Sequence, residues 1–254
     1  MDGYEASTYG DRIASVYDAW YEERLDPTSA VDFLAALASG GRALELGIGT
    51  GRVAIPLKRR GVEVHGIDAS ESMLDQLRAK SGGADIPVTV GDFTEIPVPG
   101  QFKLIYVPFT TFFALESQEH QIRCMRRVAE HLVPDGRFVI DAFVPDVKRF
   151  TDNQSTTTVK TSLGHLLVDA VRHDPLAQTI EGHHVAVEEE GVKLYPLRVR
   201  YCWPSELDLM ARLAGLALEE RFAWYDRSPF EATSKRHVSV YVNEGSSADT
   251  GSPA

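Results

Sequence analysis

The sequence has few cysteines, no long apolar run and little apolar character in its first residues. Its two cysteines, Cys124 and Cys202, are far apart and lack CxxC spacing, so we expect neither a disulfide framework nor a zinc site. No apolar run approaches the roughly 20 residues needed to span a bilayer. The first residues are acidic rather than apolar, unlike a signal peptide. We therefore expect a cytoplasmic protein without a membrane partner.

Positive charge is also scarce. The chain has 26 Lys and Arg against 37 Asp and Glu, which gives a formal net charge of −11. Nucleic acids and anionic membranes repel such a surface, so neither is an expected partner. With 254 residues, 43% of them hydrophobic, the chain is long enough for one large α/β domain or for a domain with a sizeable insertion.

Short β-branched runs alternate with amphipathic segments in the first part of the chain. The runs RALELG, VEVHGID, IPVTVGD, FKLIYVPF and RFVIDAF are typical of strands. Segments 52–60, 70–80 and 117–132 are predicted helices, and another is expected to begin with Asp26 as N-cap and Pro27 as first helical residue. The segment VPDGRF indicates a turn before the last of these strands. This alternation predicts a parallel sheet with helices on both faces.

The pattern changes after Phe143. Between residues 156 and 203, four alternating runs are separated by breaks at Gly164, Asp174–Pro175 and Gly191. These runs predict antiparallel strands joined by short turns. The segment PSELDLMARLAGL then indicates a helix capped by Ser205, and two final strands follow.

These segments divide the chain into four parts. Residues 1–25 form a predicted N-terminal helical lid, and residues 26–146 together with 204–243 form the core. Residues 147–203 form an inserted antiparallel sheet, and residues 244–254 are a predicted disordered tail.

A glycine-rich turn follows the first predicted strand. Gly47, Gly49 and Gly51 form GxGxG, whereas a dinucleotide-binding turn has GxGxxG. Glu45 precedes the first glycine by two residues, and its carboxylate suits a cationic amine better than a pyrophosphate. Glycine allows the backbone to approach a ligand closely. The turn therefore indicates a nucleoside ligand that carries an amine.

Two further acids end the next strands. Asp68 lies at the end of the second strand and suits a bidentate hydrogen bond to ribose hydroxyls. Asp92, in the segment VGDF, ends the third strand and can accept from an adenine amino group. Open α/β sheets bind ligands at this edge, so the acids and the glycine turn are expected to share one site.

Together these motifs resemble the class I S-adenosylmethionine-dependent methyltransferases. The ExGxGxG of Glu45–Gly51, the acid Asp68, the segment Gly91–Phe93 and the LxPDGxF of Leu132–Phe138 occur in the family's order. The resemblance implies an α/β fold with a Rossmann-like, seven-stranded, mostly parallel sheet, helices on both faces and a small inserted antiparallel sheet. It also implies S-adenosyl-L-methionine as methyl donor and S-adenosyl-L-homocysteine as product.

The resemblance assigns cofactor contacts to the N-terminal helix, the glycine turn and the strand ends. These are Tyr9, Tyr21, Glu45, Gly47, Gly49, Gly51, Arg52, Asp68, Ala69, Met73, Asp92, Phe93 and Val107. Glu45 and Gly47 would lie near the methionine amine, and Met73 would pack on the adenine unless it is a core residue. Arg52 would reach the methionine carboxylate or remain a solvated helix residue.

Acceptor contacts are expected from the end of the fourth strand and from the loop before the last strand. The segment Val107–Thr110 lacks the [DN]PP[YF] motif of amino- and DNA-base N-methyltransferases. Phe109 and Phe112 are expected to line an apolar acceptor pocket. Tyr225, in the loop before the last strand, is expected near the acceptor entrance.

Two catalytic candidates are Tyr17 and His184. Tyr17 and Tyr21 are one helical turn apart, which allows Tyr17 to close over the sulfonium. His183 and His184 are adjacent on a predicted strand and face opposite sides, so only one can face the pocket. We favour His184 as the base. The D…DN cluster of metal-dependent catechol-type enzymes is not evident, so no metal is expected.

The sequence therefore predicts an enzyme that moves a methyl group to an oxygen or nitrogen of a small molecule, such as a sugar or natural-product intermediate. The inserted sheet is a candidate homodimer interface. The alternatives are a non-catalytic, cofactor-binding regulatory protein, a nicotinamide oxidoreductase, and a methyltransferase that acts on proteins or nucleic acids.

Overall fold

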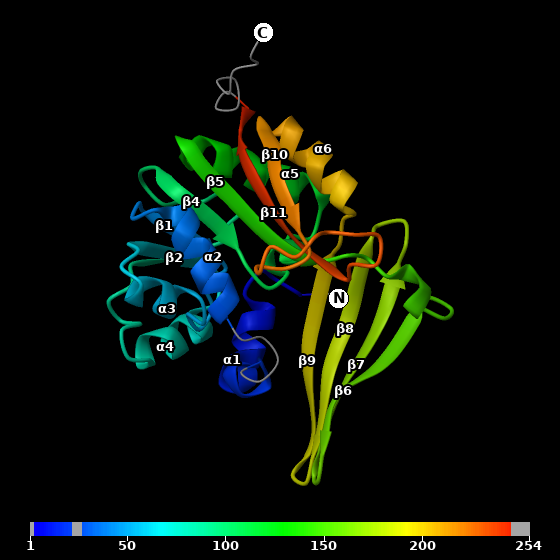
Figure 1. Ribbon diagram of the computed structural model, residues 1–254. Coiled ribbons are helices and arrows are strands. Elements are labelled where there is room, and N and C mark those ends of the chain that lie inside the picture. Colours follow the sequence, from blue (N-terminus) through cyan, green and yellow to red (C-terminus); the bar gives the residue numbers. More distant parts are fainter. Residues whose placement is uncertain (1–2, 22–26, 245–254) are drawn as a thin grey trace.

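A seven-stranded sheet forms the centre of the molecule (Figure 1). The computed structural model describes residues 3–21 and 27–244. The strand order is β10-β11-β5-β4-β1-β2-β3, and β11 runs antiparallel to both of its neighbours. The strands are β1 (Ala43–Leu46), β2 (Val64–Asp68), β3 (Val88–Val90), β4 (Phe102–Val107), β5 (Leu132–Phe143), β10 (Leu216–Phe222) and β11 (Arg236–Asn243). The expected Rossmann-like, mostly parallel sheet is confirmed.

Helices cover both faces of this sheet because its central strands are apolar on both sides. Ala43 and Leu104 pack toward one cluster, whereas Leu44 and Ile105 pack toward the other. The first cluster includes residues of α2 (Thr28–Ala38), α3 (Ala54–Arg59) and α4 (Glu71–Ala79), and the second includes residues of α5 (Gln118–His131) and α6 (Pro204–Leu213). The short 3-10 helices η1 (Thr111–Ala114) and η2 (Val147–Arg149) follow β4 and β5.

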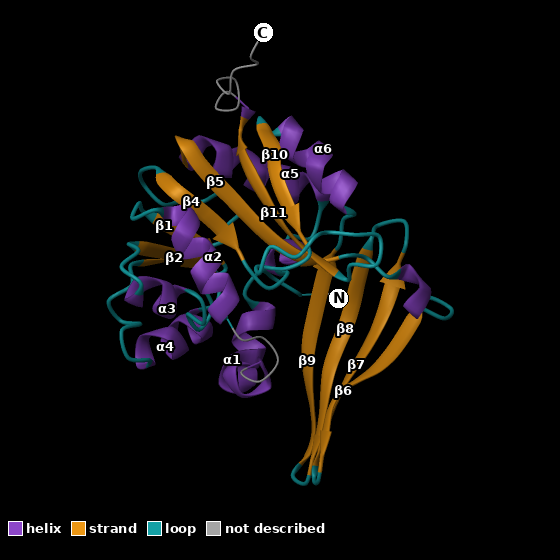
Figure 2. Cartoon of the chain, viewed as in Figure 1, coloured by secondary structure: helices purple, strands orange, loops and turns teal. Residues whose placement is uncertain are grey.

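The inserted strands form a separate antiparallel sheet that projects from the core (Figure 2). It consists, in order, of β6 (Gln154–Ser162), β7 (His165–Asp174), β8 (Thr179–Glu188) and β9 (Gly191–Arg200). We call inner the face that bears Leu167 and Tyr195, because these residues pack with Ile13 and Trp20 of α1 (Thr8–Tyr21). Helix α1 therefore lies between the inserted sheet and the core, beside β9 and α4.

Several local expectations differ from the structure. The segment VPDGRF belongs to β5, because Phe102 pairs with Leu132 and Leu104 with Arg137, so the extra residues form an irregularity inside the strand. Helix α6 is capped by Trp203 with Pro204 in its first turn, and not by Ser205. Pro27 is the N-cap of α2. The expected cap Asp26 and the tail from residue 245 onward lie outside the described residues.

Candidate functional site

The glycine turn follows β1 and has a left-handed backbone. The φ angles are 71° at Gly47, 53° at Gly49 and 78° at Gly51, a region that glycine adopts without steric cost. An added Cβ would lie 2.5 Å from Thr111 Cγ2 at Gly47 and 2.3 Å from Leu77 Cδ1 at Gly51. At Gly49 an added Cβ meets no atom of the described residues within 4 Å. Gly49 therefore faces open space.

Asp68 connects the glycine turn to the start of α4. Its Oδ2 accepts a hydrogen bond from the Gly49 amide at 2.7 Å, and its Oδ1 accepts one from the Ser70 amide at 2.9 Å. Burial raises the pKa of the Asp68 carboxyl, and the two amides act in the opposite direction. The carboxylate is thereby held at the edge where β1 and β2 end.

Glu45 is a buried acid at the end of β1. Its side chain is almost completely enclosed, and Oε2 accepts a hydrogen bond from the Tyr106 hydroxyl at 2.8 Å. Burial, together with the charge of Asp68, raises the pKa of Glu45 to about 8, whereas the bond from Tyr106 lowers it. A cation brought next to this carboxyl would favour its ionised form.

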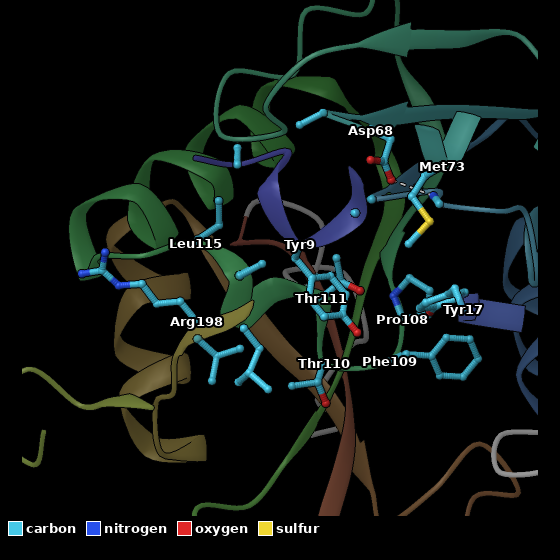
Figure 3. A pocket seen from close by; sticks show the side chains of 18 of the residues that line it. Tyr9, Tyr17, Asp68, Met73, Pro108, Phe109, Thr110, Thr111, Leu115 and Arg198 are labelled. Atoms are coloured by element: carbon cyan, nitrogen blue, oxygen red, sulfur yellow. Dashed lines mark hydrogen bonds between the residues drawn. The ribbon is translucent and has the colours of Figure 1, made fainter. Parts of the chain in front are cut away.

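A cavity of about 650 Å³ lies between the strand ends of the core, α1 and the inner face of the inserted sheet. Most of the expected site residues line it: Tyr9, Tyr17, Tyr21, Glu45, Gly47, Gly49, Arg52, Asp68, Ala69, Met73, Asp92, Phe93, Phe109 and His184. Figure 3 shows Asp68, Met73 and Tyr17 on one side of the view and Leu115 and Arg198 on the other.

Four expected site residues do not line the cavity. Val107 and Phe112 are fully buried in the core that α5 covers. Gly51 faces Leu77 and Ile55. Tyr225 is buried as well, because its hydroxyl donates to Asp141 Oδ2 at 2.7 Å and its ring packs on Phe33. In this structure the side chains of Val107, Phe112 and Tyr225 do not line the cavity in which the other expected site residues meet.

Asp92 and Met73 have dual roles. Asp92 is exposed at the cavity, but its Oδ1 already accepts bonds from the amide and the hydroxyl of Thr94. Only its other oxygen remains for a ligand. Met73 lines the cavity and also packs with Ile13 of α1 in a core cluster.

Helix α1 covers the cavity with tyrosines. The rings of Tyr17 and Tyr21 lie 4.8 Å apart, and the Tyr9 and Tyr21 hydroxyls are 3.2 Å apart. Arg52 Nη2 donates to the Tyr21 carbonyl at 2.9 Å, and its guanidinium lies 5.1 Å from the centre of the Phe109 ring. Arg52 therefore connects the end of α1 to Phe109 in the loop that follows β4.

Polar contacts also join α1 to the glycine turn and to α4. Asp18 accepts a hydrogen bond from Thr50 Oγ1 at 2.7 Å and forms an ion pair with Lys80 Nζ at 2.6 Å. Asp11 accepts one from Ser70 Oγ at 2.6 Å. The helix is thus attached to the glycine turn and to α4 on one side of the cavity.

His184 lies on the inner face of the inserted sheet, where its Nδ1 is 2.5 Å from Asp169 Oδ1. Asp169 also lines the cavity, and sequence analysis missed it. The antiparallel register pairs Asp169 on β7 directly with His184 on β8. The spacing of the two runs around the Asp174–Pro175 break was the signal that would have found it. His183 alternates to the outer face.

Apart from Thr157, the rest of the inner face that lines the cavity is apolar. It contributes Val171, Ile180, Leu197 and Val199, and Leu115 faces it from the core side. In residues 3–21 and 27–244, no group of three or more His, Cys, Asp or Glu side chains is arranged to hold a metal. Within the same residues, no helix is long and apolar enough to cross a membrane.

The arrangement fits a nucleoside that carries a cationic amino-acid end. Gly49 leaves room for a ligand at the turn, Asp68 presents a half-buried carboxylate beside it, and Glu45 supplies an acid whose ionisation a cation would favour. Arg52 directly follows the same turn and adds a cationic side chain to the cavity lining. These donors and acceptors match the chemical groups of S-adenosyl-L-methionine.

Comparison with known proteins agrees with this geometry. The family model described as a methyltransferase domain matches residues 43–136. The CcbJ methyltransferase from Streptomyces caelestis is 42% identical, with 94% of this chain and 99% of that chain covered and a TM-score of 0.90. A cypemycin N-terminal methyltransferase from a Streptomyces species is 27% identical over 202 residues, which are 79% of this chain and 82% of that protein.

A more distant structure shares the fold. The S-adenosylmethionine-bound CalS10, an amino pentose methyltransferase from Micromonospora echinaspora, is 19% identical, with 90% of this chain and 96% of that chain covered and a TM-score of 0.66. The glycine turn, the acids at the strand ends and the similarity along nearly the whole chain agree on one conclusion. The chain belongs to the class I S-adenosylmethionine-dependent methyltransferases, and its cofactor is S-adenosyl-L-methionine.

Proposed function

We propose that this methyltransferase acts on a nitrogen or oxygen of a small molecule, and that an amine nitrogen is the preferred acceptor atom. The observation that supports this proposal best is the Asp169–His184 pair on the cavity wall. The names of two similar proteins, an N-terminal methyltransferase and an amino pentose methyltransferase, support the choice of nitrogen.

The proposed reaction depends on proton removal by His184. S-adenosyl-L-methionine supplies an electrophilic methyl group on a sulfonium sulfur. An aliphatic amine is largely protonated at neutral pH and must lose a proton before its lone pair can attack. The contact of His184 Nδ1 with Asp169 leaves Nε2 as the nitrogen that accepts the proton. Asp169 orients the ring and stabilises its cationic form.

The other walls of the cavity support a small acceptor. Helix α1 and its tyrosines enclose one side, and the inner face of the inserted sheet encloses the other. Enclosure of this kind excludes water and orients the reacting atoms, which can lower the barrier by several kcal/mol. A side chain on a folded protein surface would have difficulty entering such a space.

The test is transfer of isotope-labelled methyl from S-adenosyl-L-methionine to matched acceptors. We would compare amino sugars and cyclic secondary amines with the corresponding hydroxyl compounds, and add short peptides with free N-termini and a protein extract. Label in the amines, at least tenfold above their hydroxyl counterparts, is expected. Label confined to peptides or extract proteins would contradict the proposal, and so would label confined to hydroxyl compounds.

We also propose that the outer face of the inserted sheet contacts a second copy of the chain. Leu166, Val187, Val192 and Leu194 are exposed in adjacent register rows on this face. Contiguous exposed apolar side chains on a sheet often mark an interface. Sedimentation of wild type should show a dimer that Leu194→Lys dissociates, whereas Leu209→Lys, at an exposed position on α6, should leave it intact. A monomeric wild type would contradict this proposal.

A further inference from the structure

The loop after β4 has an unusual backbone where it lines the cavity. Phe109 has a φ of 56° and Thr110 a φ of 68°, so two adjacent non-glycine residues are left-handed. This region is unfavourable for side chains, and most of all for β-branched threonine. Phe109, Thr110 and Thr111 all line the cavity. Such conformations persist only where the surroundings enforce them, and they concentrate at functional sites.

Asp141 of β5 enforces this conformation from outside the cavity. Its Oδ1 accepts a hydrogen bond from the Thr110 amide at 3.1 Å, and its backbone carbonyl accepts from the same amide at 3.2 Å. Its Oδ2 accepts from the Tyr225 hydroxyl at 2.7 Å. Asp141 and Tyr225 are both buried, and neither lines the cavity. Burial raises the pKa of Asp141, whereas the bonds from Tyr225 and the loop amides lower it.

The loop in turn determines the position of two parts of the cofactor side. The methyl group of Thr111 lies 2.5 Å from where a Cβ on Gly47 would be, so the start of the glycine turn packs closely against η1. The Phe109 ring lies 5.1 Å from the Arg52 guanidinium, and Tyr17 lies 5.8 Å from the same group. If the loop lost its left-handed conformation, Thr111 would therefore shift away from Gly47, and Arg52 would lose its contact with the Phe109 ring.

We propose that Asp141 and Tyr225 are positioning residues, which hold Phe109 and Thr110 in their left-handed conformation and thereby maintain the affinity of the methionine side of the cofactor site. The buried pair acts only through the loop, because neither residue reaches the cavity. The proposal concerns cofactor binding alone, so it stands or fails independently of the acceptor.

The first test measures the affinity of S-adenosyl-L-homocysteine by calorimetry for variants that circular dichroism shows to be folded. Asp141→Ala should bind about tenfold more weakly, equivalent to about 1.4 kcal/mol. Asp141→Asn keeps an oxygen that can accept from the Thr110 amide, so it should stay within about threefold of wild type. Unchanged binding by Asp141→Ala would overturn the proposal.

A double-mutant cycle separates positioning from general packing. Glycine adopts a positive φ without steric cost, so Thr110→Gly should hold the loop conformation even without Asp141. In the wild-type background, Asp141→Ala should lower the affinity for S-adenosyl-L-homocysteine about tenfold. In the Thr110→Gly background, the same substitution should lower it less than about threefold. An equal loss in both backgrounds would mean that Asp141 acts through general stability, and it would overturn the proposal.

A second pair of variants tests the tyrosine and remains informative if Asp141→Ala does not fold. Tyr225→Phe removes the hydroxyl that orients Asp141, so its affinity should fall about threefold or more. Tyr241→Phe is the matched control. Tyr241 lies on strand β11, and its hydroxyl also donates to a carboxylate, that of Asp208, at 2.8 Å. Tyr241 does not line the cavity. Both variants should melt at lower temperature, but only Tyr225→Phe should bind more weakly. Equal affinities would overturn the role of Tyr225.

Discussion

His184 Nδ1 lies 2.5 Å from Asp169 Oδ1, and the two residues face each other across adjacent strands of the inserted sheet. Because both line the cavity, the inserted sheet contributes an acid–base pair to the site and not only a cover. The pair is on the side of the cavity formed by this sheet, whereas the glycine turn belongs to the core.

This pair predicts a large loss of turnover when the histidine is removed. His184→Ala should lower kcat with an amine acceptor by about 100-fold, and Asp169→Asn by about tenfold, because general-base catalysis contributes factors of this order. S-adenosyl-L-homocysteine affinity should change little. His183→Ala is the matched control, since it lies one residue away on the opposite face, and should retain activity within about twofold. If His183→Ala and His184→Ala lose activity equally, the proposed base is wrong.

The glycine turn predicts a position-specific effect of one methyl group. Gly47→Ala should weaken S-adenosyl-L-homocysteine binding by about tenfold or more, because the new Cβ would strain the backbone and meet Thr111 at 2.5 Å. Gly61 has a φ of 87° and an open Cβ position outside the cavity. Gly61→Ala should therefore lower stability by about 1 kcal/mol without changing affinity. Calorimetry and thermal melting compare the two variants.

The buried Glu45 predicts a loss of stability as pH rises. Its pKa is raised from 4.5 to about 8, so the folded state binds a proton that the unfolded state releases between these values. The stability linked to this proton is fully present below pH 4.5 and is lost as pH rises toward 8. Urea denaturation at pH 5, 6.5 and 8 measures the free energy of unfolding, and in Glu45→Gln this free energy should depend less on pH than in wild type. A difference between variant and wild type that is independent of pH would contradict this assignment.

The same residue predicts pH-dependent binding. A cationic amine near Glu45 favours its ionised form, so affinity for S-adenosyl-L-homocysteine should rise from pH 6 to 8 with release of up to one proton. Calorimetry in buffers of different ionisation enthalpy measures the proton. Tyr106→Phe removes a bond that lowers the pKa of Glu45, and it should move the profile to higher pH. The Glu45→Gln variant should release no proton when the ligand binds. If the pH dependence of affinity is the same in Glu45→Gln as in wild type, another group is responsible for the titration.

The polar attachment of α1 predicts a role as a lid. Asp18→Ala removes the contacts to Thr50 and Lys80, so S-adenosyl-L-homocysteine should dissociate about three- to tenfold faster in stopped-flow fluorescence. Asp32→Ala removes an exposed ion pair with Arg60 and serves as the control, with an unchanged dissociation rate. If both variants release the ligand at the wild-type rate, α1 is not held closed by these contacts.

Local patterns were enough to predict much of the cofactor side. Glu45, Gly47, Gly49 and Asp68 lie at the ends of two apolar strands, and parallel strands bring such ends to one edge regardless of the details of packing. The alternation of His183 and His184 likewise follows from strand geometry alone, and the structure places His184 on the cavity.

Other positions depended on packing that no local pattern contains. Phe112 was expected in the pocket, but it is fully buried in the core that α5 covers, and Phe109 lines the cavity instead. Tyr225 was expected to contact the acceptor, but a carboxylate on a distant strand accepts its hydroxyl. Asp169 is an exception, because the spacing of the β7 and β8 runs around their turn sets the register that pairs it with His184, and sequence analysis did not use this spacing.

The sequence by itself determined the fold class, because hydrophobic periodicity is a local property of the chain. It indicated the cofactor through the resemblance of its glycine turn and strand-end acids to one family. The tertiary structure decided which side chains share the cavity: the Asp169–His184 pair, the tyrosines of α1, and the Asp141–Tyr225 pair behind the loop. These groupings depend on register, on layer packing and on two left-handed residues held by a buried carboxylate. Each joins residues far apart in the sequence, so only the folded chain brings them together.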